Sequence, residues 1–163
     1  MGIIDLDGNE LFNSLVKPSK RKRISKDATA IHGLSMSDLK EAPAFKDLAS
    51  KINSVIKNKI VIIYNAEYDE RLIMNTCEQD EIKYLSFRSH CAMIHYSKYK
   101  GKWSDYHYSY TFQRLPGGDH SAVGDCLATL KVIHTMANSA LHHSEDQIES
   151  WSRPVKKWWE FWK

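Results

Sequence analysis

KIVIIYNAEYD, residues 59–69, is the stretch of sequence that decides the fold. Its first half is a continuous β-branched run, which is typical of a strand buried on both faces of an α/β sheet. The polar half that follows then lies at the carboxyl end of the strand, where open α/β sheets bind their ligands. We therefore expect an α/β fold in which Asp69 stands at a functional position.

Apolar periodicity and turn signals predict the elements on either side of this strand. A β-hairpin is expected over residues 2–5 and 10–16, because Asp7-Gly8 is a strong two-residue turn signal. A helix is expected from Pro43 to about Asn58, since apolar residues recur there at helical spacing. The remaining expected elements are a helical turn over 35–38, a helix through 72–74, a strand over 84–87, and helices over 91–99 and 121–138.

The composition is that of one soluble domain. A chain of 163 residues lies within the roughly 100 to 200 usual for a domain, with 42% hydrophobic and 26% charged residues. No apolar run approaches the roughly 20 residues that cross a bilayer, and the acidic first ten residues exclude a signal peptide, so a cytoplasmic location is expected. Three irregularly spaced cysteines exclude a disulfide framework and a zinc site.

Two segments outside the predicted elements are rich in cations or aromatic side chains. The first is a basic run that includes Lys20, Arg21, Lys22 and Arg23. It suits a phosphate backbone, because each cation that meets a phosphate releases a counterion, although a solvated loop is the commoner outcome. The second is a polar linker with an aromatic and basic tail, which can bind a protein, lie on a membrane surface or fold back. We therefore divide the chain into a domain, residues 1–143, and a tail, residues 144–163.

Asp69, His120 and Asp125 are the candidate chemical residues. Asp125 falls in the first turns of the last predicted helix, and His120 comes just before it. Two carboxylates from different elements form a hard-oxygen site for Mg²⁺ or Mn²⁺, and a nearby imidazole can take a proton from water. From the residues alone, purely structural roles are the alternative: a carboxylate at a helix N-terminus, a loop histidine and a surface helix residue.

Four segments, in order along the chain, resemble the DEDDh 3′–5′ exonuclease family, which includes RNase T and the proofreading subunit of bacterial replicative polymerase. They are LFNSLVKP (residues 11–18), AIHGL (30–34), the strand with its polar end (60–69) and HSAVGD (120–125). The last two are similar to the family motifs HNAxFD and HxAxxDA. The resemblance implies a ribonuclease H-like fold, a mixed sheet flanked by helices. It also implies hydrolysis of phosphodiester bonds at single-stranded DNA or RNA ends, with two Mg²⁺ or Mn²⁺ ions.

The resemblance also assigns a role to each matching residue. Asp69 and Asp125 would be catalytic metal ligands, and His120 would be the general base. The implied nucleic-acid contacts are Ile31, His32, Gly33, Asn65 and Tyr68. The first three would pack against the terminal nucleotide, and the last two would shape the floor of the site.

The first motif of the family, Asp-x-Glu on the opening central strand, has no counterpart here. Asp5-Leu6-Asp7 has similar spacing but lies in the predicted hairpin turn, where a polar turn role is favoured. We therefore expect the first central strand to be missing or rebuilt, which leaves two unpaired strand edges. A second copy or a partner protein would fill that gap. Residues 112–120 are also too few for the helix that the family usually has there.

Three functions fit these features. The favoured one is a metal-dependent 3′–5′ exonuclease on single-stranded ends, weakened by an incomplete two-metal site. The second is a nucleic-acid-binding relative without catalysis. The third is a protein-interaction module that uses the exonuclease scaffold and the aromatic tail.

Overall fold

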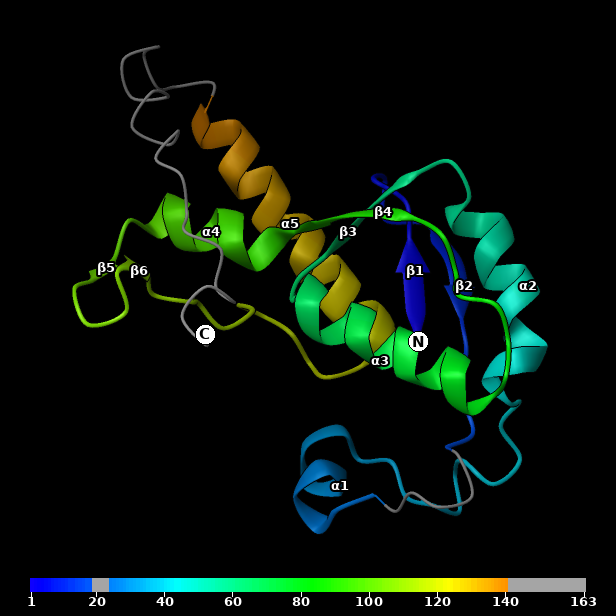
Figure 1. Ribbon diagram of the computed structural model, residues 1–163. Coiled ribbons are helices and arrows are strands. Elements are labelled where there is room, and N and C mark those ends of the chain that lie inside the picture. The colour runs from blue at the N-terminus through cyan, green and yellow to red at the C-terminus, as the bar shows by residue number, and fades with distance from the viewer. Residues whose placement is uncertain (19–23, 141–163) are drawn as a thin grey trace.

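The computed structural model describes residues 1–18 and 24–140 and has the expected α/β fold (Figure 1). The basic run at residues 20–23 and the tail at residues 144–163 lie outside the described residues. In chain order, the elements are β1 (Gly2–Ile4), β2 (Glu10–Asn13), α1 (Lys26–His32), α2 (Phe45–Ile56), β3 (Ile60–Ile63), α3 (Ala66–Gln79), β4 (Arg88–Cys91), α4 (Ala92–Lys100), β5 (Trp103–Ser104), β6 (Ser109–Tyr110) and α5 (Ala122–Ala140).

The sheet is divided into two-stranded parts. β1 pairs with β2 in an antiparallel hairpin, and β3 pairs with β4 in parallel through the crossover helix α3. Within residues 1–18 and 24–140, neither β1 nor β3 has a second hydrogen-bonded neighbour. The expectation of two unpaired edges in the sheet is therefore confirmed.

Burial of β3 on both faces was expected, and that prediction is wrong. Ile60 and Ile62 are 52% and 40% exposed, whereas Val61, which points to the opposite face, packs against the core. A strand in a sheet has two faces, and here only one of them meets a packed layer. The β-branched run therefore forms a half-buried strand.

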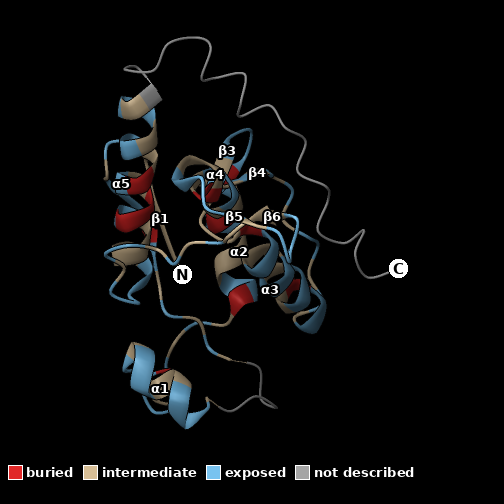
Figure 2. Cartoon of the chain, turned by 90° about the vertical axis from the view of Figure 1, so that its left-hand side faces the viewer, coloured by how far each residue is buried: buried red, intermediate tan, exposed pale blue. Residues whose placement is uncertain are grey.

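The main core joins β2, α2 and α3. Its buried members are Phe12, Phe45, Ile52, Ile56 and Cys77. α5 packs separately against β1, with buried side chains in the middle of the helix (Figure 2). Gly2 permits this contact, because a Cβ atom there would lie only 2.9 Å from the backbone carbonyl carbon of Ala122. The start of β1 is thereby held against the first turn of α5.

Several boundaries differ from the predicted ones. The strand expected at 84–87 lies at Arg88–Cys91 instead, because the apolar side chains of residues 85 and 87 pack against the main core. Helix α1 was not predicted, although Ser25 caps it by accepting a 3.1 Å hydrogen bond from the Ala28 N–H. α1 buries no residue and lies apart from the other helices in both views (Figures 1 and 2).

Other expectations about the same regions are met. Residues 112–120 contain no helix, as their small number implied. The turn at 35–38 is closed by the Asp38 carboxylate, which accepts a 2.7 Å hydrogen bond from the Ser35 N–H. Over the part of the chain that the structure describes, no helix is both long and apolar enough to cross a membrane.

Candidate functional site

Asp69 lies in the first turn of α3, just beyond the end of β3. The chain turns from strand to helix at Asn65, whose carbonyl accepts a 3.2 Å hydrogen bond from the Asp69 N–H. The Asp69 side chain is half-buried, and burial raises the pKa of its carboxyl group. A group with a raised pKa in the folded protein is one that a cation would stabilise in its charged form.

A tight turn before α5 holds His120 next to Asp125. Two positions in this turn require glycine. Gly117 has a φ of 75°, and a Cβ atom on Gly118 would lie only 2.6 Å from Oδ1 of Asp125. His120 itself has a φ of 63°, and its N–H donates a 3.2 Å hydrogen bond to Asp125 Oδ1. Asp119 Oδ1 accepts a 2.9 Å hydrogen bond from the Ser121 N–H and so braces the turn.

The charges of both carboxylates act on Cys126. Burial raises the pKa of the Cys126 thiol, and the negative charges of Asp125 and Asp69 raise it further. Both carboxylates, Asp69 on α3 and Asp125 on α5, are therefore close enough to Cys126 for their charges to act on its thiol. Cys126 Sγ also lies 3.5 Å from the carbonyl oxygen of Gly2, which puts the start of β1 at this position.

His120 is joined to this site through its backbone. Its imidazole is exposed, whereas its N–H makes the contact with Asp125. The side chain is therefore open to a molecule approaching from solvent.

The donor set fits one hard cation better than two. Among the residues that the structure describes, no three His, Cys, Asp or Glu side chains form a cluster that could hold a metal ion. One or two carboxylates, completed by water and a substrate phosphate, are a usual Mg²⁺ environment. A two-ion site needs further carboxylates to hold ions roughly 3.5 to 4 Å apart, and these are lacking in the described part of the chain.

Asp5 has the turn role that the sequence favoured. Its Oδ1 accepts hydrogen bonds of 2.9 Å each from the N–H groups of Asp7 and Asn9. The bonds from Asn9 lower the pKa of the Asp5 carboxyl. This carboxylate closes the hairpin turn and is not a substitute for the first exonuclease motif.

The expected nucleic-acid contacts lie in two places. Asn65 and Tyr68 flank Asp69, and the exposed ring of Tyr68 has the guanidinium of Arg71 5.7 Å from its centroid. Of the other three, Ile31 and His32 end α1, and Gly33 is its C-cap. Their hydrogen bonds are local: for example, the Leu34 N–H donates to His32 Nδ1 at 3.0 Å.

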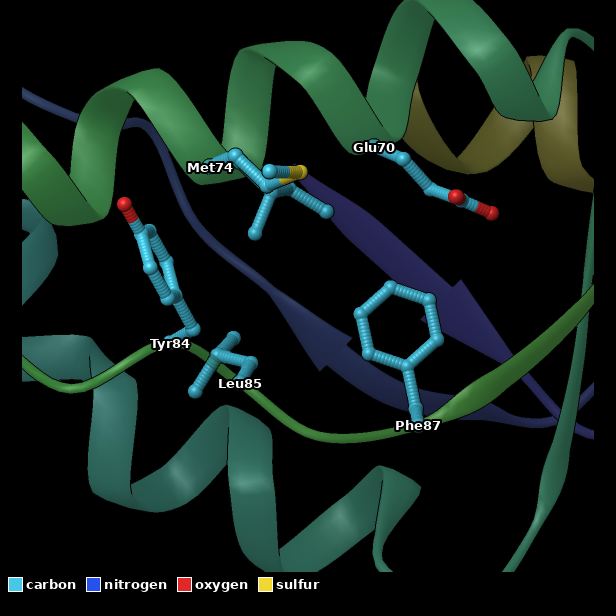
Figure 3. A pocket seen from close by; sticks show the side chains of 6 residues that line it. Glu70, Met74, Tyr84, Leu85 and Phe87 are labelled. Carbon is cyan, nitrogen blue, oxygen red and sulfur yellow. The ribbon is translucent and has the colours of Figure 1, made fainter.

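A cavity of about 120 Å³ lies between α3 and the segment at residues 84–87 (Figure 3). Its lining consists of Glu70, Ile73, Met74, Tyr84, Leu85 and Phe87. The carboxylate at its rim, Glu70, accepts a hydrogen bond from the Ser89 hydroxyl. Ligand pockets usually measure about 300 to 1,000 Å³, so this space is too small for a nucleotide. It includes none of the predicted site residues.

Cys126 and Gly2 are the residues of this site that sequence reasoning did not find. Neither carries a catalytic signal by type, and their place depends on the packing of β1 against α5. A glycine opening a strand is the one hint that the backbone there approaches another element closely.

Comparison with known proteins assigns the family. Residues 1–133 match the exonuclease family represented by RNase T. The chain is 36% identical over 152 residues to the uncharacterized exonuclease CP81 of Escherichia phage 186, covering 83% of this chain and 77% of that protein. It is 32% identical over 83 residues to the DNA polymerase III subunit epsilon of Buchnera aphidicola, covering 51% of this chain and 35% of that protein.

Two further similarities extend along most of the chain. RNA exonuclease 4 of Gibberella zeae is 23% identical over 135 residues, which cover 80% of this chain and 40% of that protein. A solved structure of exonuclease X in complex with 5′ overhanging duplex DNA superposes with a TM-score of 0.57 at 19% identity, covering 93% of this chain and 87% of that one. The chain therefore belongs to the RNase T exonuclease family and has its ribonuclease H-like α/β fold.

Proposed function

We propose that this protein is a metal-dependent 3′–5′ exonuclease that hydrolyses phosphodiester bonds at the ends of single-stranded nucleic acid. The observation that carries the proposal is the match of residues 1–133 to the exonuclease family, with Asp69 in the first turn of α3 and Asp125 hydrogen-bonded to the His120 N–H in the first turn of α5. The activity would belong to the domain over residues 1–143, acting in the cytoplasm. The relatives include both a DNA polymerase subunit and an RNA exonuclease, so DNA and RNA ends are both candidate substrates.

Asp69 and Asp125 would hold a divalent cation, Mg²⁺ or Mn²⁺. Such an ion, when bound, lowers the pKa of water and offsets the charge on the phosphate. His120 would accept the proton that the attacking water loses, and its exposed imidazole suits an open strand end. The exposed ring of Tyr68, next to Asp69, would stack on the terminal base.

A second ion requires carboxylates from elsewhere, and the divided sheet offers a place for them. β1 and β3 each lack a second hydrogen-bonded neighbour within the described residues. An extended segment can add to an exposed strand edge through main-chain hydrogen bonds. A second copy of the chain or a partner protein would supply such a strand, and full activity would depend on it.

The test is a digestion assay on single-stranded DNA and RNA oligonucleotides labelled at the 5′ end, with Mg²⁺, Mn²⁺ or EDTA. The native chain should shorten them stepwise from the 3′ end, only with metal present. Asp125→Asn and Asp69→Asn should slow this at least a hundredfold, whereas Glu67→Gln, an exposed carboxylate in the same helical turn as Asp69, should not.

His120 is tested with a substitution that respects its backbone. Its φ of 63° is one that asparagine tolerates, so His120→Asn removes the imidazole without forcing the turn to change. We expect strong loss of digestion in this variant and none in His134→Asn, an exposed histidine on α5. The proposal is contradicted if the native chain digests no oligonucleotide with either metal, even at protein concentrations at which it forms dimers. If the chain binds the oligonucleotides but does not digest them, it is a nucleic-acid-binding relative without catalysis.

A further inference from the structure

A short hairpin made by β5 and β6 presents an unusual number of aromatic rings to solvent. Residues 98–112, here called the aromatic hairpin, include Trp103, Tyr106 and Tyr108, which are 50%, 87% and 70% exposed. The hairpin projects beyond the C-terminal end of α4, at the side of the fold (Figure 1). Large apolar side chains gathered on an exposed projection mark a surface that binds something.

Two ring pairs in the hairpin have a defined geometry. Trp103 pairs across the two strands with Tyr110, and the two rings meet edge to face with centroids 5.2 Å apart. Beyond this pair, the hairpin is closed by a 2.8 Å hydrogen bond from the Thr111 N–H to the Lys102 carbonyl. At the turn, Tyr106 lies edge to face with His107 at 4.8 Å. Rings fixed in this way lose little conformational entropy when a ligand stacks on them.

The charge of the hairpin identifies the kind of ligand. Together with the last turn of α4 that leads into it, the hairpin contains three lysines, Lys98 and Lys100 on α4 and Lys102 before β5, against one acidic residue, Asp105. Lys100 and Lys102 are exposed, and Lys98 is half-exposed. Exposed aromatic rings next to cations match single-stranded nucleic acid, whose bases stack on the rings while its phosphates contact the cations.

The distance from the candidate site to the hairpin determines which nucleotides of a bound substrate the hairpin would contact. α4 starts beside the end of β3, where the Met93 N–H donates a 2.8 Å hydrogen bond to the Tyr64 carbonyl. The nine residues of α4 span about 14 Å at 1.5 Å per residue. Stacked nucleotides advance about 3.4 Å each, so this distance corresponds to roughly four nucleotides.

We propose that the aromatic hairpin is a second binding surface for the substrate strand, contacting nucleotides about four positions upstream of the terminal one. Trp103, Tyr106 and Tyr108 supply the stacking surfaces, and the three lysines contact phosphates. Recognition at this surface is independent of sequence, because every base has a face that stacks. The inference rests on the proposed function for its direction along the strand, and its binding test is independent of catalysis.

The experiment measures binding of fluorescent single-stranded oligonucleotides of three and ten nucleotides to the full chain by anisotropy, in EDTA. The native chain should bind the ten-nucleotide strand more tightly. The Trp103→Ala/Tyr106→Ala/Tyr108→Ala variant should bind it at least tenfold more weakly and bind the three-nucleotide strand as the native chain does. The matched variant with phenylalanine at the same three positions keeps an aromatic ring at each. Its affinity for the ten-nucleotide strand should stay within about threefold of the native affinity, because the rings can still stack on bases.

The cations are tested by salt dependence. Lys98→Gln/Lys100→Gln/Lys102→Gln should reduce the slope of log affinity against log salt by up to about 2, at about 0.7 for each single-strand phosphate contact. Lys57→Gln/Lys59→Gln, at the opposite end of β3, should leave the slope unchanged. If the triple alanine variant does not fold, the Tyr106→Ala/Tyr108→Ala variant replaces it in the binding test, because both of these side chains are largely exposed.

Two results would overturn the inference: equal affinity of the native chain for both lengths, or unchanged affinity for ten nucleotides in the alanine variants. Either result would indicate that the hairpin binds a protein and not the substrate strand. If the native chain fails to digest oligonucleotides but the length-dependent loss is seen, the proposed function fails and the hairpin surface stands. If digestion occurs and the alanine variants bind as native, only the hairpin inference fails.

Discussion

Two adjacent glycines in the turn before α5 should respond to alanine in opposite ways. Gly118 does not have a positive φ, but a Cβ atom there would be 2.6 Å from Asp125 Oδ1 and 3.3 Å from a methyl group of Leu115. Gly117 has a φ of 75° and open space where its Cβ atom would be. Gly118→Ala therefore displaces a functional group, whereas Gly117→Ala only strains the backbone.

The magnitudes follow from these contacts. In Gly118→Ala, the Asp125 carboxylate must retreat by about 0.8 Å to reach an ordinary contact of 3.4 Å. Misplacement of a reacting group by about 1 Å can cost about a hundredfold in rate, so we expect a loss of that order. Its free energy of unfolding should change little, because the weakened His120–Asp125 hydrogen bond, about 1 kcal/mol, offsets the entropy that alanine removes from the unfolded chain.

Gly117→Ala should show the reverse pattern. Left-handed backbone costs about 1 to 2 kcal/mol for alanine, and the unfolded-state gain returns about 0.4 to 1 kcal/mol. A net loss of about 1 kcal/mol lowers Tm by about 2 to 4 °C in a chain of this size. The assay compares initial rates on a labelled single strand at 20 °C with Tm from circular dichroism. Native-like rates in a folded Gly118→Ala variant would refute the role given to the Asp125 carboxylate.

Three further changes test other parts of the structure. Asp69→Asn should raise Tm at pH 7, because burial raises the pKa of Asp69 and the folded state is penalised as pH rises through that pKa; in a pH series of Tm, the gain should fade toward pH 4, near the ordinary pKa. Tyr64→Phe removes a 2.9 Å hydrogen bond from the tyrosine hydroxyl to the Gln113 carbonyl and should cost about 1 kcal/mol by urea unfolding, with Tyr106→Phe as a neutral control. Because the pKa of Tyr64 is raised to about 12, that cost should be constant below pH 10. Ile52→Ala empties a fully buried position and should cost about 2 to 5 kcal/mol by the same measurement, and equal stability would contradict the assigned core.

Local signals in the sequence were enough to predict most of the helices and the hairpin. The apolar spacing along residues 45–56 and the Asp7-Gly8 turn each encode one element through its own neighbours. The exposure of Ile60 could not be predicted in this way, since it depends on what packs on the far face of β3. Tyr84 and Phe87 have strand-forming side chains, yet they line a cavity against α3, and the ladder begins one residue later.

The candidate site was predictable only in part for a related reason. Asp69 and Asp125 stand in recognisable segments, and their closeness to Cys126 follows from where a strand end and a helix start lie in this fold. The aromatic hairpin showed no periodicity because its strands have only two residues each, one aromatic residue and one serine. Its rings pair across the strands, which a pattern read along one segment does not reveal.

The division of the sheet also separates the two candidate metal ligands. Asp69 is carried by the β3–α3 unit, whereas Asp125 belongs to α5, which packs on β1. Within residues 1–18 and 24–140, side chains of both units pack in one core, and no ladder of main-chain hydrogen bonds joins β1 to β3. The spacing of the two carboxylates can therefore vary as the units shift against each other. A strand that bridged the break would fix that spacing, so the proposed nuclease activity would depend on assembly.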